Sequence, residues 1–118
     1  MQILNSLVYV PAKDYEVSQR FYRALGFTLT PGFGKTMDCS LGGMTFRLQD
    51  YYVEDWANNF MFVVFVDDAQ AWFEKASALR ADFPGVRVKP PEPVGDDSVT
   101  HVVDPTGVLL VLVQSAKR

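Results

Sequence analysis

The sequence has one cysteine, one histidine and no long apolar run, and each scarcity excludes a class of protein. Because a lone thiol, Cys39, cannot form an internal disulfide, a disulfide-stapled secreted fold is excluded. The longest apolar run covers residues 60–66, whereas a membrane span needs about twenty residues. No basic segment followed by a long apolar one opens the chain. We therefore expect no export signal, no membrane partner and a reducing, cytoplasmic setting.

Basic residues are also too few and too dispersed for a nucleic-acid-binding protein. Eleven Lys and Arg stand against fourteen Asp and Glu, a net charge of −3, and no stretch clusters the basic ones. A phosphate backbone would find no electrostatic footprint here. With 118 residues, 48% hydrophobic and 21% charged, the composition suits one globular domain spanning residues 1–118 and excludes disordered and fibrous classes.

The first half of the chain, about residues 1–50, predicts a strand, a helix and three further strands. Asp14 is a good N-cap for the helix, and Gly26 supplies its stop. The apolar stripe of that helix comprises Val17, Phe21, Ala24 and Leu25. The expected strands cover residues 3–10, 27–30, 36–41 and 44–49.

The second half, about residues 59–118, repeats this order. Asp67 and Asp68 cap a second helix, with Ala69, Trp72, Phe73, Ala76 and Leu79 along one face. Strands are expected at residues 60–66, 86–89, 99–103 and 108–113, with a proline-rich acidic loop at 90–97 and a turn at 104–107. The economical interpretation is an α+β fold made of a duplicated βαβββ module.

Four short motifs in this frame resemble the vicinal oxygen chelate superfamily, which includes glyoxalase I, extradiol dioxygenases and the bleomycin-resistance proteins. They are VPAKD at residues 10–14, LGF at 25–27, FVDD at 65–68 and DPTG at 104–107. Each motif is weak alone, but their order and spacing span nearly the whole chain. The resemblance implies paired modules whose sheets curve around a cavity, helices outside, and a homodimer.

The chain departs from the metal-dependent members of that superfamily. Their pattern of metal ligands falls on Leu7, Arg47, Met61 and Val111. Neither aliphatic side chains nor a guanidinium can donate to a metal. A site of two histidines and one carboxylate cannot be assembled either, because His101 is the only histidine. We therefore expect no metal and no cofactor, which disfavours an enzyme.

Two isolated groups have a structural interpretation and a functional one. His101 lies in the strand before Asp104, where it is either a partly buried histidine with a backbone partner or a residue for ligand contact or proton transfer. Cys39 lies between Met37 and Leu41 in an expected strand and has no adjacent His or Lys. We expect an inert core thiol there.

Arg47 lies on the polar side of a strand whose other side, Met44, Phe46 and Leu48, faces the core. The arginine is either exposed or paired within the chain. If the resemblance extends to geometry, it stands instead in a mostly apolar cavity and needs a carboxylate or a ligand with negative charge or acceptor oxygens. The cavity residues would then include Tyr9, Arg47, Met61, Val63, Phe65 and Val111.

The segment that joins the two halves, residues 50–59, is rich in aromatic side chains. Tyr51, Tyr52 and Trp56 lie where a plain tether would have Gly, Ser or Pro. Three roles remain open: packing on the domain itself, a dimer contact, or a ligand wall to which Tyr51 and Trp56 contribute. Trp72 falls on the apolar stripe of the second helix and is expected in the core.

These observations support three hypotheses about function. The leading one is a metal-free, homodimeric protein that binds a small planar or aromatic ligand in an apolar cavity and sequesters an antibiotic or a toxic metabolite. The second is a glyoxalase-type metal-dependent lyase, isomerase or dioxygenase. The third is a pure interaction module in which Tyr51, Tyr52 and Trp56 face a protein partner.

Overall fold

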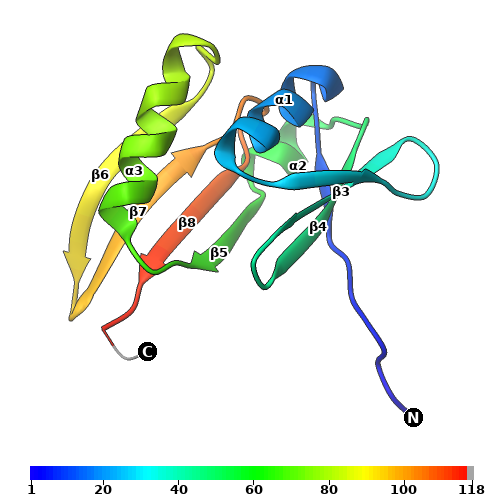
Figure 1. Cartoon of the computed structure of the whole chain (residues 1–118). Helices are drawn as coiled ribbons and strands as arrows, with labels where there is room; N and C mark the ends of the chain where they lie inside the picture. The colour runs from blue at the N-terminus through cyan, green and yellow to red at the C-terminus, as the bar shows by residue number, and fades with distance from the viewer. Residues whose placement is uncertain (117–118) are drawn as a thin grey trace.

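Two four-stranded sheets, one from each half of the chain, form the frame of the molecule (Figure 1). The computed structural model describes residues 1–116. Sheet A has the order β1 (Tyr9–Pro11), β4 (Met44–Gln49), β3 (Thr36–Leu41) and β2 (Thr28–Pro31). Sheet B has the corresponding order β5 (Met61–Phe65), β8 (Leu109–Gln114), β7 (Asp97–Val103) and β6 (Arg87–Val94). The predicted α+β class and duplicated βαβββ module are confirmed, with curved sheets that do not close on each other.

Two helices cover one side of these sheets and leave the other side open (Figure 1). The first helix, α1 (Tyr15–Leu25), begins where the Asp14 carboxylate accepts the Val17 N–H at 3.1 Å and ends at Gly26, whose φ of 118° suits glycine. The second, α3 (Ala69–Ala78), has an equivalent cap at Asp68 and continues into a single 3-10 turn, η1 (Leu79–Ala81). Within residues 1–116, no helix is long and apolar enough to cross a membrane.

Two of the predicted strands differ from the structure by more than two residues at one end. The expected strand at residues 3–10 pairs with β4 only at Tyr9–Pro11. The hydrogen bond nearest the N-terminus joins the Arg47 N–H to the Val8 C=O at 2.9 Å, and the residues before Val8 lie outside the sheet. The expected loop at residues 90–97 belongs largely to β6, which pairs with β7 through an irregularity between Lys89 and Glu92. Prolines are tolerated there because β6 is an edge strand.

The structure adds one helix that was not predicted and corrects the predicted apolar stripe of α1. The joining segment contains a short helix, α2 (Glu54–Asn58), which buries Ala57. On α1 the predicted stripe included Ala24, which is exposed, whereas Tyr22 is fully buried. Tyr22 lies inside because a buried polar partner, Asp104, accepts a hydrogen bond from its hydroxyl group.

That partner belongs to the turn between β7 and β8. One oxygen of the Asp104 carboxylate accepts the backbone N–H groups of Thr106, Gly107 and Val108 at 2.9–3.0 Å, and the other accepts the Tyr22 hydroxyl at 2.7 Å. Ser18 adds a hydroxyl contact with Thr106 at 3.2 Å. The turn of module 2 is thereby joined to the helix of module 1 through buried, fully partnered polar groups.

Candidate functional site

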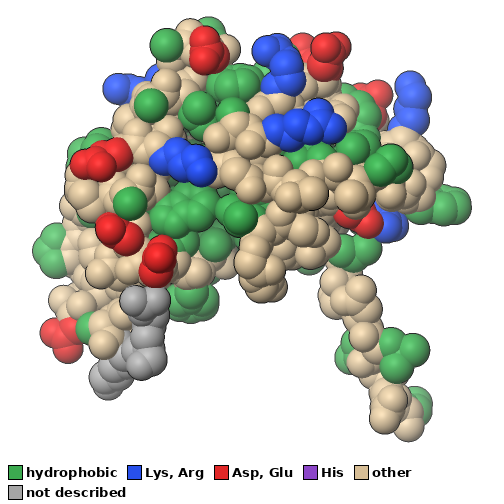
Figure 2. Space-filling model, in the orientation of Figure 1, with side chains coloured by type: hydrophobic (Ala, Val, Ile, Leu, Met, Phe, Trp, Pro, Cys, Tyr) green, Lys and Arg blue, Asp and Glu red, His purple; other side chains and the backbone are tan. Residues whose placement is uncertain are grey.

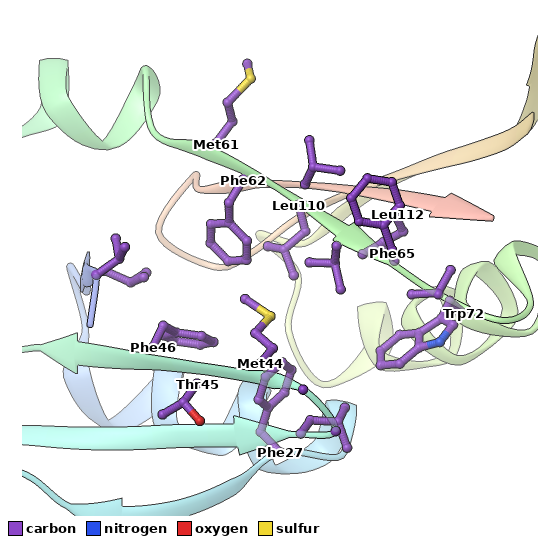
Figure 3. A pocket seen from close by; sticks show the side chains of 18 of the residues that line it. Phe27, Met44, Thr45, Phe46, Met61, Phe62, Phe65, Trp72, Leu110 and Leu112 are labelled. Carbon is purple, nitrogen blue, oxygen red and sulfur yellow. The ribbon is translucent and has the colours of Figure 1, made fainter. Parts of the chain in front are cut away.

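An apolar cleft lies where the two modules meet, between the start of β4 and the whole of β5 (Figure 3). Its volume of about 830 Å³ is within the range of small-molecule sites. In Figure 3, Phe62 extends from β5 toward Phe46 on β4, and Trp72 lies at one end of the space. The ring centres of Phe46 and Phe62 are 5.8 Å apart, so the two side chains approach each other from opposite sides of the cleft.

The walls are apolar because they are the edge of the hydrophobic core. Apart from glycine and the indole N–H of Trp72, Thr45 and Asp67 are the only polar side chains on the lining within residues 1–116. Figure 2 shows hydrophobic side chains gathered at the surface between the two halves of the molecule. The lining consists of Val8, Val10, Phe27, Leu41, Gly42, Gly43, Met44, Thr45, Phe46, Phe60, Met61, Phe62, Val63, Val64, Phe65, Val66, Asp67, Trp72, Leu110 and Leu112.

The cleft is bounded by strand edges without a neighbouring strand. β5 is the first strand of sheet B and pairs only with β8. On the other side, β1 pairs with β4 from Arg47 onward, so Met44, Thr45 and Phe46 have no β1 partner. Backbone N–H and C=O groups therefore line parts of an otherwise apolar space, where a ligand or another strand can bind them.

A polar cluster lies on the open side of sheet A. Arg47 donates to both oxygens of Asp38, from Nε at 2.7 Å and from Nη2 at 3.1 Å, and its guanidinium lies 5.8 Å from the centre of the Tyr9 ring. Gly32 must be small here, because a Cβ would lie 2.8 Å from the Asp38 carboxylate. The guanidinium holds the pKa of Asp38 below its ordinary value of 3.8. Of the roles considered for Arg47, the structure thus shows a pairing within the chain, with Asp38.

The open side of sheet B is apolar on β5 and β8 and carries His101 on β7 and Lys89 on β6. Its registers place Val63, Val111, His101 and Lys89 in one row across the four strands. His101 thus lies between Val111 and Lys89, and the Lys89 ammonium is paired with Glu92 at 2.7 Å. None of the helices in the described part of the chain covers this side (Figure 1). The β5 residues Met61, Val63 and Phe65 are 61%, 53% and 75% exposed.

The structure divides the predicted site residues among four places. Met61, Val63 and Phe65 lie along the cleft, although the Met61 side chain points away from the space between the strands (Figure 3). Tyr9 and Arg47 lie on the open side of sheet A, and His101 and Val111 on that of sheet B. The last two predicted residues, Tyr51 and Trp56, pack together with ring centres 6.3 Å apart and remain 51% and 65% exposed near α2.

Sequence reasoning missed the residues that give the cleft its aromatic character. Phe46, Phe62 and Trp72 were expected in the core, and they do contact it, but each also lines the cleft. Hydrophobic periodicity shows which residues face inward, but it cannot show where the two modules fail to meet. Of the two tryptophans, Trp72 lines the cleft in addition to packing against the core, and Trp56 does not line it.

Two further observations concern metal ligands and nucleophilic side chains. Within residues 1–116, no three His, Cys, Asp or Glu side chains lie close enough together to hold a metal ion. The Cys39 thiol is buried, and burial raises its pKa to about 12. Such a thiol is not a nucleophile near neutral pH.

Comparison with solved structures gives the geometry a context. The chain superposes on a bleomycin resistance determinant encoded on the transposon Tn5 with a TM-score of 0.78 and 21% identity, covering 97% of this chain and 99% of the other. The chain has the bleomycin-resistance fold. An antibiotic binding protein from Streptomyces sp. CB03234 is similar with a TM-score of 0.74 and 23% identity, covering 98% and 100%.

Enzymes share this fold as well. A lactoylglutathione lyase from Agrobacterium tumefaciens matches with a TM-score of 0.69 and 15% identity, covering 97% of this chain and 96% of the other. No family model and no curated protein matches the sequence. The similarity at these identities establishes the fold, and the function must be argued from the site.

The Arg47–Asp38 pair predicts that the folded state loses stability in acid. Since the pKa of Asp38 is lowered in the folded state, the stabilisation is complete above the ordinary pKa of Asp and is lost as the pH falls through the folded value. In Arg47→Met the pKa of Asp38 should return toward its ordinary value, as measured by NMR titration of the carboxyl group. Arg80→Met, which removes an exposed arginine elsewhere, is the control. Identical Asp38 titrations in the wild type and Arg47→Met would contradict the assignment.

Proposed function

We propose that the protein binds a small, largely apolar planar or aromatic ligand in the cleft, without a metal, and so sequesters an antibiotic or a toxic metabolite. The observation that carries this proposal is the cleft itself, which has aromatic walls and few polar side chains among the residues that the structure describes, namely Thr45, Asp67 and the indole N–H of Trp72. Apolar walls with few polar anchors are typical of small-molecule sites. The bleomycin-resistance and antibiotic-binding proteins of the same fold support the proposal.

The lining also indicates which ligands are disfavoured. A strongly anionic ligand would lose its hydration without gaining a cationic partner, because no Lys or Arg side chain within residues 1–116 lines the cleft. Arg47, the cation expected to anchor such a ligand, is occupied by Asp38 on the open side of sheet A. A ligand without net charge, or one with a cationic group near Asp67, fits better.

The metal-dependent lyase, isomerase or dioxygenase is the alternative, and the residues do not favour it. The positions that hold metal ligands in such enzymes are occupied by Leu7, Arg47, Met61 and Val111, none of which can donate to a metal. The interaction module, the third hypothesis, rests on the exposed ring pair Tyr51 and Trp56.

The tryptophans allow a direct test of the cleft. Nile red, an uncharged planar dye, should bind the wild-type protein and quench the fluorescence of Trp72 by energy transfer. Trp72→Ala should weaken dye binding by about 1–3 kcal/mol, the usual effect of losing an aromatic anchor. Trp56→Ala is the matched control and should leave the affinity unchanged. Both are measured by fluorescence titration.

The opposite pattern would overturn this assignment. If Trp56→Ala weakened dye binding and Trp72→Ala did not, the ligand would lie against α2 and not in the cleft. Since truncation of Trp72 also affects the core, Trp72→Phe serves as a second variant that keeps a ring in the site.

We also propose that the protein is a homodimer. The exposed apolar row of β5 and the uncovered side of sheet B support this, because monomers rarely leave a contiguous apolar patch in water. Light scattering on the purified protein tests it. The chain mass is 13.3 kDa, so a particle of twice that mass is expected, and a particle of the chain mass would contradict the proposal.

A further inference from the structure

We propose that the ring pair formed by Tyr51 and Trp56 is the docking surface for a basic segment of another protein, with an Arg or Lys side chain lying over the rings. Both residues belong to the segment that joins the two modules, where α2 follows β4 along the chain (Figure 1). Residues 50–59 do not contribute to the lining of the cleft, so this surface is separate from the proposed ligand site.

The two rings form an exposed aromatic surface on an anchored backbone. Their centres are 6.3 Å apart and their planes are inclined by 41°. Both side chains are exposed, whereas Ala57, the residue after Trp56, is fully buried and donates its N–H to the Val53 C=O at 2.9 Å. A partner would therefore meet rings whose backbone is already ordered, which lowers the entropic cost of binding.

The residues beside the rings are acidic. Asp50 precedes Tyr51, and Glu54 and Asp55 precede Trp56. All three are exposed, and within residues 1–116 none of their carboxylates makes a hydrogen bond or an ion pair. An anionic partner would be repelled here, and an apolar one would strip water from the carboxylates without replacing it. The surroundings of the rings therefore favour a cation.

A neighbouring ring of the same segment already holds a cation. The ammonium nitrogen of Lys13 lies 5.4 Å from the centre of the Tyr52 ring. Aromatic faces attract cations in this way, and the indole of tryptophan does so most strongly. In the part of the chain that the structure describes, no Lys or Arg lies over Tyr51 or Trp56. A partner can thus supply at this ring pair the contact that Lys13 makes with Tyr52.

A cation carried on a protein suits this surface better than a free one. Small-molecule sites are concave and bury most of their ligand, whereas both rings are more than half exposed. A lone small cation would therefore gain few contacts. An Arg or Lys side chain within a basic segment gains the ring contact, and its basic neighbours are attracted by Asp50, Glu54 and Asp55.

The ring contact is tested with a fluorescently labelled peptide of alternating Arg and Gly, titrated with the full-length protein and followed by anisotropy. The wild type should bind this peptide. Trp56→Ala should weaken binding about fivefold, the order of an exposed cation–π contact, and Trp56→Phe should restore part of the loss because it keeps a ring. Phe33→Ala is the matched control, since it removes an exposed ring from a stretch, residues 31–36, that has Lys35 and no acidic residue.

The control should bind the peptide as the wild type does. Equal affinity of the wild type and Trp56→Ala would overturn the proposal, as would a wild type that does not bind the peptide.

The contribution of the carboxylates is tested in the same assay. Asp50→Asn with Asp55→Asn should weaken peptide binding about fivefold, and the loss should shrink as salt is added. The matched control, Asp82→Asn with Asp96→Asn, changes the net charge equally at exposed residues of module 2. It should keep the wild-type affinity. Equal losses in the two double variants would mean that net charge alone attracts the peptide, which would overturn the docking surface.

The source of the cation is tested by competition with methylguanidinium. At an equal concentration of guanidinium groups, this small cation should displace the labelled peptide about tenfold less effectively than an unlabelled copy of the peptide does. Equal displacement would overturn a protein partner and indicate a site for free cations. Because these experiments use no cleft ligand, their failure is distinct from a failure of Nile red to bind.

Discussion

The rest of the structure depends on the hydrogen bond between Tyr22 and Asp104. It joins the helix of module 1 to the turn of module 2, and both side chains are fully buried. Burial raises the pKa of Asp104, while the Tyr22 hydroxyl and three backbone N–H groups act in the opposite direction. Burial and the nearby carboxyl raise the pKa of Tyr22 well above 10.0. Each group is a hydrogen-bond partner of the other, so removing either one leaves a buried polar atom without that partner.

The repeat explains why the cleft lies where it does. The caps Asp14 and Asp68 are 68 − 14 = 54 residues apart, so the counterpart of Tyr22 on α3 is Ala76. The counterpart of the Asp104 turn is the β3–β4 turn, with Gly42 and Gly43, which have open space beside them. One of the two equivalent junctions is therefore joined by a polar network, and the other lacks it and lines the cleft.

Much of the fold could be predicted from the sequence because local rules determine it. The two aspartate caps, the Gly26 stop and the order of strands follow from short-range patterns, and all appear in the structure. The length of β1 could not be predicted in this way. Residues 3–8 have strand propensity, but they pair only where the edge of a neighbouring strand is available to them. That availability depends on the tertiary structure.

The candidate site could be predicted only in part, for a similar reason. The resemblance led us to expect Met61, Val63 and Phe65 in one cavity, and in the structure they lie on β5, which borders the cleft. The resemblance could not show that Asp38 pairs with Arg47 across two strands, nor that Trp72 lies at a gap between modules. Such facts depend on how the two modules meet.

The central role of the Tyr22–Asp104 hydrogen bond is tested most directly by the free energy of unfolding of Tyr22→Phe, measured by urea denaturation. This change removes one hydroxyl group and leaves the packing of the ring in place, so the Asp104 carboxylate loses its 2.7 Å partner. We expect a loss of about 1–3 kcal/mol, the cost of a buried polar group left unpartnered. Tyr51→Phe, on an exposed ring, should change the value by less than about 0.5 kcal/mol. Equal, small effects of the two substitutions would contradict the central role given to the Tyr22–Asp104 junction.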